Sequence, residues 1–226
     1  MSVKLEANDL HIWFYVSLFG FIVIMLPYFL SLEHLKLEDK YGKEKGRKIG
    51  EIYGVISGWG FFLFWFGIWF TPQDRFITPF FQDFSIQIPV FNLTIYLVNF
   101  VIFIPFFIVG AWFGIKGVIN TSLKVAETHR AERIVTTGVY SIVRHPQYFG
   151  GLLAHIGFSF LLSGLYSLLA TPLVIAVIYI ISWKEEKELI KEFSQEYEDY
   201  RSKVPMMIPI YNRTRHVPSN SVQLKE

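Results

Sequence analysis

The chain contains several apolar runs, each close to the length that crosses a lipid bilayer. The first, "LHIWFYVSLFGFIVIMLPYFLSL", extends from Leu10 to Leu32. A helix rises about 1.5 Å per residue, so roughly 20 apolar residues cross a hydrocarbon core. Backbone N–H and C=O groups must find partners inside the bilayer, and helices satisfy them within one segment. The runs therefore predict an all-α membrane protein.

Further apolar runs extend from Ile52 to Phe70, from about Phe91 to Ile115, and from Tyr148 to Trp183. The last is about twice the length of one span and is interrupted at Ser163-Gly164, which predicts a C-terminal helical hairpin with a tight turn. About five transmembrane helices are expected in total. A hydrophobic content of 52% agrees with this class of protein.

Lys and Arg alternate between the two sides of these expected spans. Glu33–Glu51 holds six of them, Lys116–Gln147 five and the chain after Trp183 eight, whereas Thr71–Val90 holds only Arg75. Because basic residues are retained on the cytoplasmic side, we expect the N-terminus outside and the active site and C-terminus in the cytoplasm. A net charge of +2 is too small to indicate nucleic-acid binding.

The polar segment "HRAERIVTTGVYSIVRHPQY" precedes the fourth expected span. Pro146 suits the first position of a helix, with His145 flanking it. A helix start offers unpaired N–H groups and partial positive charge. Together with Arg144, this predicts a pocket for a carboxylate or phosphate. The alternative is that Arg144 and His145 only anchor the span in the headgroup region.

A second polar segment, "WKEEKELIKEFSQEYEDYRSKVP", follows the fifth expected span. Apolar residues recur in it at helical spacing, which predicts a cytoplasmic amphipathic helix along the membrane surface that ends at Pro205. Its apolar positions are Leu189, Ile190, Phe193, Tyr197 and Tyr200. Most of its acids, including Glu188, are expected to form the solvated face.

Glu185 and Glu186 differ from these acids because they lie at the membrane exit, where unpaired acids are costly. The hairpin should bring them to Arg144 and His145, so these four residues are the predicted catalytic group. A cationic end and an anionic end suit a zwitterionic ligand. No metal is expected, because no His spacing typical of zinc sites is present, Cys is absent and Arg144 would repel a cation.

The order "TGVYSIVRHPQYFGG", then "EEKELIKEFSQEYEDYRSKVPMMIP", resembles the integral-membrane methyltransferases that include isoprenylcysteine carboxyl methyltransferase and the phospholipid N-methyltransferases. The resemblance covers about Glu132 to Pro209. It implies an enzyme that transfers a methyl group from S-adenosyl-L-methionine to a membrane-embedded lipid or prenylated acceptor. The chain is expected to form one domain over 1–226, with membrane helices in 1–115, a cofactor-binding catalytic region in 116–211 and a tail in 212–226.

The resemblance further implies which residues bind the cofactor. Carried over by position, they are Glu132, Arg133, Ile134, Val135, Gly138, Tyr140, His145, Pro146, Gln147, Tyr148, Glu185 and Glu186. The prenylcysteine enzymes usually have His at the position of Glu132.

One face of the fourth expected span presents Leu152, His155 and Ser159 below Tyr148. His155 lies two turns into the bilayer, where an ionisable residue should face protein or water. One interpretation is an acceptor tunnel lined by these three residues and Ile181. The alternative is that His155 donates to a carbonyl of a neighbouring helix.

Ile181 stands where the prenylcysteine methyltransferases carry an Arg associated with the acceptor. Its apolar side chain favours an amine acceptor, as in phospholipid N-methylation, over a prenylcysteine carboxylate. Carboxyl methyl esterification of prenylcysteine is the alternative. A non-enzymatic scaffold or small transporter is a third possibility, but transporters of this kind usually show repeated halves and midplane ionisable residues, and the chain shows neither a repeat nor a central acid.

Overall fold

A computed structural model describes residues 7–78, 84–89, 93–122, 125, 129 and 133–209, with side chains from residue 11 onward. In this part of the chain, three segments are long and apolar enough to cross a membrane: His11–Leu32, Lys43–Phe70 and Leu97–Thr121. The first consists of α1 (Ala7–Val23) and α2 (Met25–Leu32), and the others are α4 and α5. The predicted all-α membrane class is confirmed.

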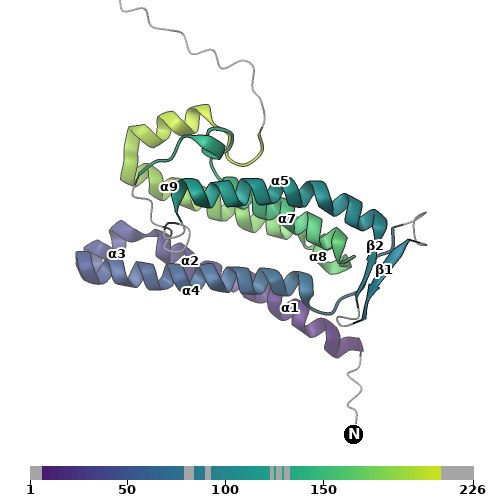
Figure 1. Cartoon of the computed structure of the whole chain (residues 1–226). Coiled ribbons are helices and arrows are strands. Elements are labelled where there is room, and N and C mark those ends of the chain that lie inside the picture. The colour runs from purple at the N-terminus through teal and green to yellow at the C-terminus, as the bar shows by residue number, and fades with distance from the viewer. Residues whose placement is uncertain are drawn as a thin grey trace, which may run out of the picture.

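The helices lie in two layers (Figure 1). Helix α4 packs against α1, α2 and α3 (His34–Tyr41) in one layer, and α5 packs along α7 (Pro146–Leu161) in the other. Helix α9 (Thr171–Lys203) joins the layers through contacts with α2 and α7. The close pairing of α5 with α7 depends on glycine: a Cβ atom at Gly150 would lie 2.5 Å from the carbonyl oxygen of Gly110.

The predicted C-terminal hairpin consists of α7, the short helix α8 (Leu165–Leu169) and α9. The turn lies at Ser163-Gly164, as expected, and Asn99 of α5 donates to the Ser163 hydroxyl at 2.9 Å. Helix α7 has 16 residues, and the apolar part of α9 ends at Trp183. Helix α7 and the apolar part of α9 are therefore each shorter than the three membrane-length segments.

Residues 93–96 are not helical, although the sequence places the third span from about Phe91. They form strand β2 (Leu93–Tyr96), which pairs antiparallel with β1 (Ser85–Ile88), Ser85 opposite Tyr96 and Ile88 opposite Leu93. The sequence Leu-Thr-Ile-Tyr is rich in β-branched and aromatic residues, which favour a strand. Helix α5 consequently begins at Leu97.

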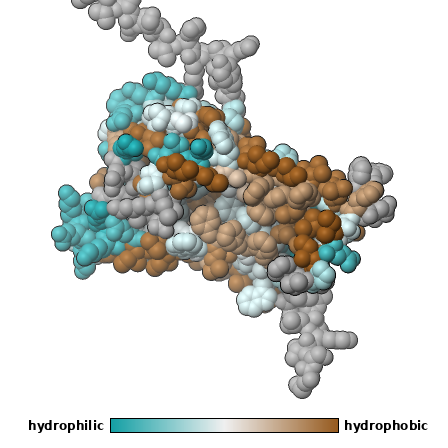
Figure 2. Space-filling model, in the orientation of Figure 1, coloured by the Kyte–Doolittle hydropathy of each residue, from teal (hydrophilic) through white to brown (hydrophobic). Residues whose placement is uncertain are grey.

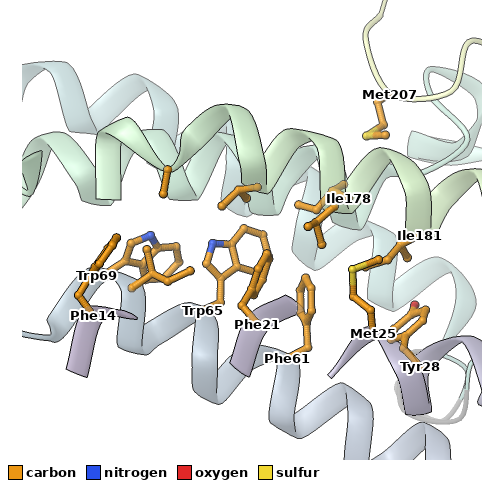
Figure 3. Close-up of a cluster of buried hydrophobic side chains, with 14 of the residues drawn as sticks. Phe14, Phe21, Met25, Tyr28, Phe61, Trp65, Trp69, Ile178, Ile181 and Met207 are labelled. Atoms are coloured by element: carbon orange, nitrogen blue, oxygen red, sulfur yellow. The ribbon is translucent and has the colours of Figure 1, made fainter. Parts of the chain in front are cut away.

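An aromatic core fills the space between the two layers. Trp65 of α4 packs beside Phe21 of α1 and Trp69 lies near Phe14, while Ile178 and Ile181 of α9 lie closer to Phe61 and Met25 (Figure 3). Apolar area gives little drive for helix association in lipid, so shape-matched packing of this kind carries the association.

Polar surface gathers at one end of the molecule, around α3, the start of α4 and the end of α9 (Figure 2). Helix α9 runs into this end without a break at the membrane exit, and bends at Ser194, whose φ is 48°. It ends at Lys203, close to the predicted stop at Pro205. Its apolar residues Tyr197 and Tyr200 are buried against Ile134 and Val204, so this face packs on the protein rather than lying on the bilayer.

Candidate active site

The Arg-His-Pro turn and the C-terminal Val-Pro segment hold each other through the backbone. Pro146 begins α7 and His145 is its N-cap residue, as the sequence predicts. The N–H of Arg144 donates to Pro205 O at 2.9 Å, and the N–H of His145 donates to Met206 O at 3.0 Å. Two motifs that are distant in sequence therefore form one unit at the polar end of the molecule.

The Arg144 guanidinium is buried and makes four hydrogen bonds. Its Nε and Nη2 donate to the two carboxylate oxygens of Glu186 at 2.7 and 3.0 Å. Its Nη1 donates to the carbonyls of Arg201 and Val204, at the end of α9 where no helical N–H is available. Arg144 is thus a positioning residue that ties the turn to α9, and not a free headgroup anchor.

His145 lies between the two glutamates of α9. Its Nε2 is 3.1 Å from Glu186 Oε1 and its Nδ1 is 3.4 Å from Glu185 Oε2. Burial lowers the pKa of His145, but the hydrogen bonds to both glutamates outweigh this and leave the pKa raised. Burial raises the pKa of Glu185 and Glu186, yet contacts with His145, and with Arg144 for Glu186, leave both lowered. These charges balance, as buried charges must.

Two tyrosine hydroxyls complete the surroundings of Glu185. Tyr28 of α2 and Tyr148 of α7 each lie 2.5 Å from Glu185 Oε1 and donate to it. The Tyr148 ring also stacks on His145. Sequence reasoning missed Tyr28, because a tyrosine near the end of a membrane span is common and carries no motif.

A cavity of about 770 Å³ opens beside this cluster, within the range of roughly 300–1,000 Å³ typical of small-molecule sites. The predicted site residues on its wall are Arg133, Ile134, Val135, Tyr140, Arg144, His145, Gln147, Tyr148 and Glu185. The predicted residues away from the described wall are Gly138, Pro146 and Glu186. Glu132 lies outside the described residues.

The three residues away from the wall have structural roles. Gly138 begins the 3-10 turn η2 (Gly138–Ser141) with φ +64°, a conformation that favours glycine. Pro146 is buried at the start of α7. Glu186 stands behind His145 and holds Arg144.

Much of the cavity wall comes from the first half of the chain and from positions that the sequence did not single out. They include Tyr28, His34, Arg47, Glu51, Val55, Trp59, Phe62 and His129. Glu188 also lines the cavity and pairs with Lys184 and Lys191 at 3.2 and 2.9 Å. Its side chain is only 12% exposed, so the expectation that it lies on a solvated face is wrong.

The structure does not place the predicted acceptor tunnel at this cavity: among the described wall residues, none is Leu152, His155, Ser159 or Ile181. Leu152 packs on the aromatic core, to which Ile181 belongs. His155 Nδ1 accepts from the indoles of Trp65 and Trp69 at 3.0 and 2.8 Å, and its Nε2 donates to Ser167 O. The Ser159 hydroxyl donates to His155 O. His155 therefore braces the core, as the alternative interpretation holds.

Residues 93–196 match the family described as phospholipid methyltransferase. The protein-S-isoprenylcysteine O-methyltransferase of Saccharomyces cerevisiae is 39% identical over 84 residues, which are 34% of this chain and 32% of that protein. Methanethiol S-methyltransferase 2 of Bradyrhizobium diazoefficiens is 38% identical over 73 residues, 31% of this chain and 27% of that protein. The chain thus spans about a third of the length of these relatives. No solved structure matches.

Proposed function

We propose that this chain, whose residues 93–196 match the phospholipid methyltransferase family, transfers a methyl group from S-adenosylmethionine to an acceptor that arrives from the bilayer. The observation that carries the proposal is the cavity on whose wall Glu185, His145 and Tyr148 of the family segment meet Tyr28 of α2. A charged cluster and an apolar helix wall in one cavity suit a polar cofactor beside an apolar acceptor.

The cavity wall offers groups that complement S-adenosylmethionine. Glu185 presents a carboxylate that suits an ammonium or a hydroxyl group. Arg133 is exposed at the wall, and no ion pair of its side chain is seen among the described residues, so its guanidinium would complement a carboxylate of the ligand. Tyr140 and Tyr148 add aromatic rings. When bound, S-adenosylmethionine supplies an electrophilic methyl group on a sulfonium.

The chain's own residues have two tasks in such a transfer: they orient the two ligands and they exclude water. The Arg144–Glu186 pair holds His145 and the start of α7 against α9. His145, Tyr28 and Tyr148 then fix the Glu185 carboxylate at the cavity wall. No protein nucleophile is needed for this reaction class.

The carboxylate of an S-prenylcysteine is the acceptor that we place first. Relatives named protein-S-isoprenylcysteine O-methyltransferase support it. The argument for an amine depended on Ile181, but Ile181 is buried in the aromatic core and does not line the described cavity. On α4, Val55, Trp59 and Phe62 line the cavity and are also exposed, which suits entry of a prenyl chain from the lipid.

We also propose that the cavity opens toward the cytoplasm. Lys36, Lys40, Lys43, Arg47 and Lys48 all lie on α3 and the start of α4, at the polar end of the molecule (Figure 2), and Arg47 lines the cavity. Basic residues of this kind are retained on the cytoplasmic side.

The test is a methylation assay with purified full-length protein in nanodiscs and labelled S-adenosylmethionine. The acceptors are N-acetyl-S-farnesylcysteine, methanethiol and phosphatidylethanolamine, each offered alone, with product identified by mass spectrometry. We expect a base-labile methyl ester on the farnesylcysteine. Transfer only to methanethiol would indicate a thiol acceptor. Transfer only to the aminophospholipid would indicate an amine acceptor. No transfer, together with no binding of S-adenosylhomocysteine, would contradict the proposal.

A further inference from the structure

His129 is a cavity residue that the catalytic cluster described above does not use. Its ring lies on the Tyr28 ring, with centroids 4.0 Å apart and an angle of 34° between the planes. Its backbone has φ 54°, in the left-handed region, and His34 Nε2 lies 3.1 Å from its carbonyl oxygen. Both His129 and His34 line the cavity. The ring is thus held by Tyr28, and the backbone of the same residue by His34, both from the N-terminal half of the chain.

The hydrogen bonds around Ser31 determine which nitrogen of His129 carries the proton. The Ser31 hydroxyl donates its single proton to Tyr28 O at 2.6 Å. The same oxygen lies 2.8 Å from His129 Nδ1. Because a hydroxyl has one proton, Ser31 Oγ must accept from Nδ1–H. A neutral His129 therefore has an unprotonated Nε2 with a free lone pair.

Nothing in the described part of the chain occupies that lone pair. No donor to His129 Nε2 is seen there, and this nitrogen is not among the buried polar atoms without a partner. His129 Nε2 therefore keeps some accessible surface. Because His129 lines the cavity, we place this surface on the cavity side. Burial lowers the pKa of His129 to about 4, so the ring is neutral and the lone pair is present at physiological pH.

We propose that His129 Nε2 accepts a hydrogen bond from an N–H or O–H group of bound S-adenosylmethionine. Tyr28 touches both His129 and Glu185, so two acceptors, one neutral and one anionic, flank the same side chain. A ligand group between them must be a donor, such as an ammonium, an amino group or a hydroxyl. A carboxylate there would meet two acceptors in a buried site and would be repelled. The acceptor carboxylate consequently lies elsewhere in the cavity.

This inference rests on the proposed function, and calorimetric titration with S-adenosylhomocysteine tests it without catalysis. His129→Phe keeps an aromatic ring on Tyr28 and removes both nitrogens. His129→Gln keeps an acceptor oxygen near the place of Nε2. We expect His129→Phe to bind about ten- to a hundredfold more weakly than the wild type, and His129→Gln to remain within a few-fold of it. His11→Phe, at the opposite end of the molecule, is the matched control and should bind normally.

A spectroscopic measurement covers the case in which His129→Phe does not fold. In ¹⁵N-histidine-labelled protein, the signals missing from His129→Gln identify His129. We expect a protonated Nδ1 and an unprotonated Nε2, with the Nε2 signal shifted when S-adenosylhomocysteine binds.

Three results would overturn the inference: wild-type affinity in His129→Phe, equal losses in both His129 variants, or an Nε2 signal that S-adenosylhomocysteine leaves unmoved. Each of these leaves the proposed function intact provided that the wild type binds S-adenosylhomocysteine. Absence of binding to the wild type would overturn both.

Discussion

Arg144 and Glu186 form a two-bonded ion pair inside the protein, with Nε–Oε1 and Nη2–Oε2 distances of 2.7 and 3.0 Å. Their side chains are 8% and 6% exposed. Such a pair gives geometric precision as well as energy, because the planar guanidinium matches both carboxylate oxygens. Glu186 Oε1 accepts from Arg144 Nε and also lies 3.1 Å from His145 Nε2, so the pair aligns His145 as well. The pair therefore holds His145 in place, and Arg144 itself also lies on the cavity wall.

Replacing Arg144 should lower stability as well as activity. Arg144→Ala removes the two-bonded guanidinium partner of the buried Glu186, and breaking a buried pair costs about 3–5 kcal/mol. We expect a clear fall in the melting temperature, measured by scanning fluorimetry in detergent, and loss of methyl transfer. Lys36→Ala removes a surface ion pair with Glu33 and should change the melting temperature little. An Arg144→Ala protein with normal stability and turnover would contradict the assignment.

Glu185 should contribute to cofactor binding more than any acid on the outer side of α9. Removing a charge-assisted contact from a partly buried site weakens binding about ten- to a hundredfold. We expect this loss for Glu185→Gln in titrations with S-adenosylhomocysteine. Glu196→Gln is the control, since Glu196 is exposed and is not among the described wall residues. Equal affinities of the two variants would rule out the role of Glu185.

Because of His145, the free energy of unfolding should fall as the pH rises through the raised pKa of this side chain. Its raised pKa means that the folded protein holds this proton more tightly than the unfolded chain does. The stabilising contribution is complete below the usual histidine pKa of about 6.5, and is lost as the pH rises through the raised value. Glu185 and Glu186, with lowered pKa, contribute above the usual carboxyl pKa and lose that contribution as the pH falls through the lowered one.

The measurement is the melting temperature of the wild type and of His145→Gln from about pH 5.5 to about 9. We expect the difference between them to shrink as the pH rises. His11→Gln serves as the control for loss of an imidazole elsewhere. A difference that stays constant over the whole range would show that His145 does not bind a stabilising proton.

Trp59 should affect the prenylated acceptor and not the cofactor. It lines the cavity from α4 and is exposed at the outer surface of the helix. Trp59→Ala removes apolar contact area, so we expect KM for farnesylcysteine to rise several-fold, while the affinity for S-adenosylhomocysteine stays the same. Leu63→Ala is the control, because Leu63 is exposed on the same helix and is not among the described wall residues. An equal effect of both variants on KM would exclude a specific acceptor path at Trp59.

The orientation in the membrane can be measured directly, because the chain has no Cys. Single cysteines at Lys45, on the exposed start of α4, and at Gln87, on β1, mark the two ends of the bundle. We expect a membrane-impermeant maleimide to label Gln87→Cys in intact cells and Lys45→Cys only after permeabilisation. The reverse labelling would place the cavity outside.

The sequence by itself determined the class of the protein and the approximate positions of its apolar helices. Apolar runs of bilayer length, the turn at Ser163-Gly164 and the Pro146 helix start are local signals, so they did not depend on neighbouring segments. The hairpin they predict brings Arg144, His145, Glu185 and Glu186 together, as the structure shows. The strand at Leu93–Tyr96 was missed because an apolar run of this kind has no period that separates it from a helix.

Only the tertiary structure decided which groups face the cavity. Consecutive helical residues point about 100° apart, so Glu185 lines the cavity while its neighbour Glu186 turns inward to Arg144. Tyr28 reaches the site from α2, and His129 from the polar segment before α7. No local pattern in the sequence links either residue to Glu185. His155 likewise belongs to the core because two tryptophans of α4 donate to it. These roles depend on contacts between residues far apart in the chain, and packing alone establishes such contacts.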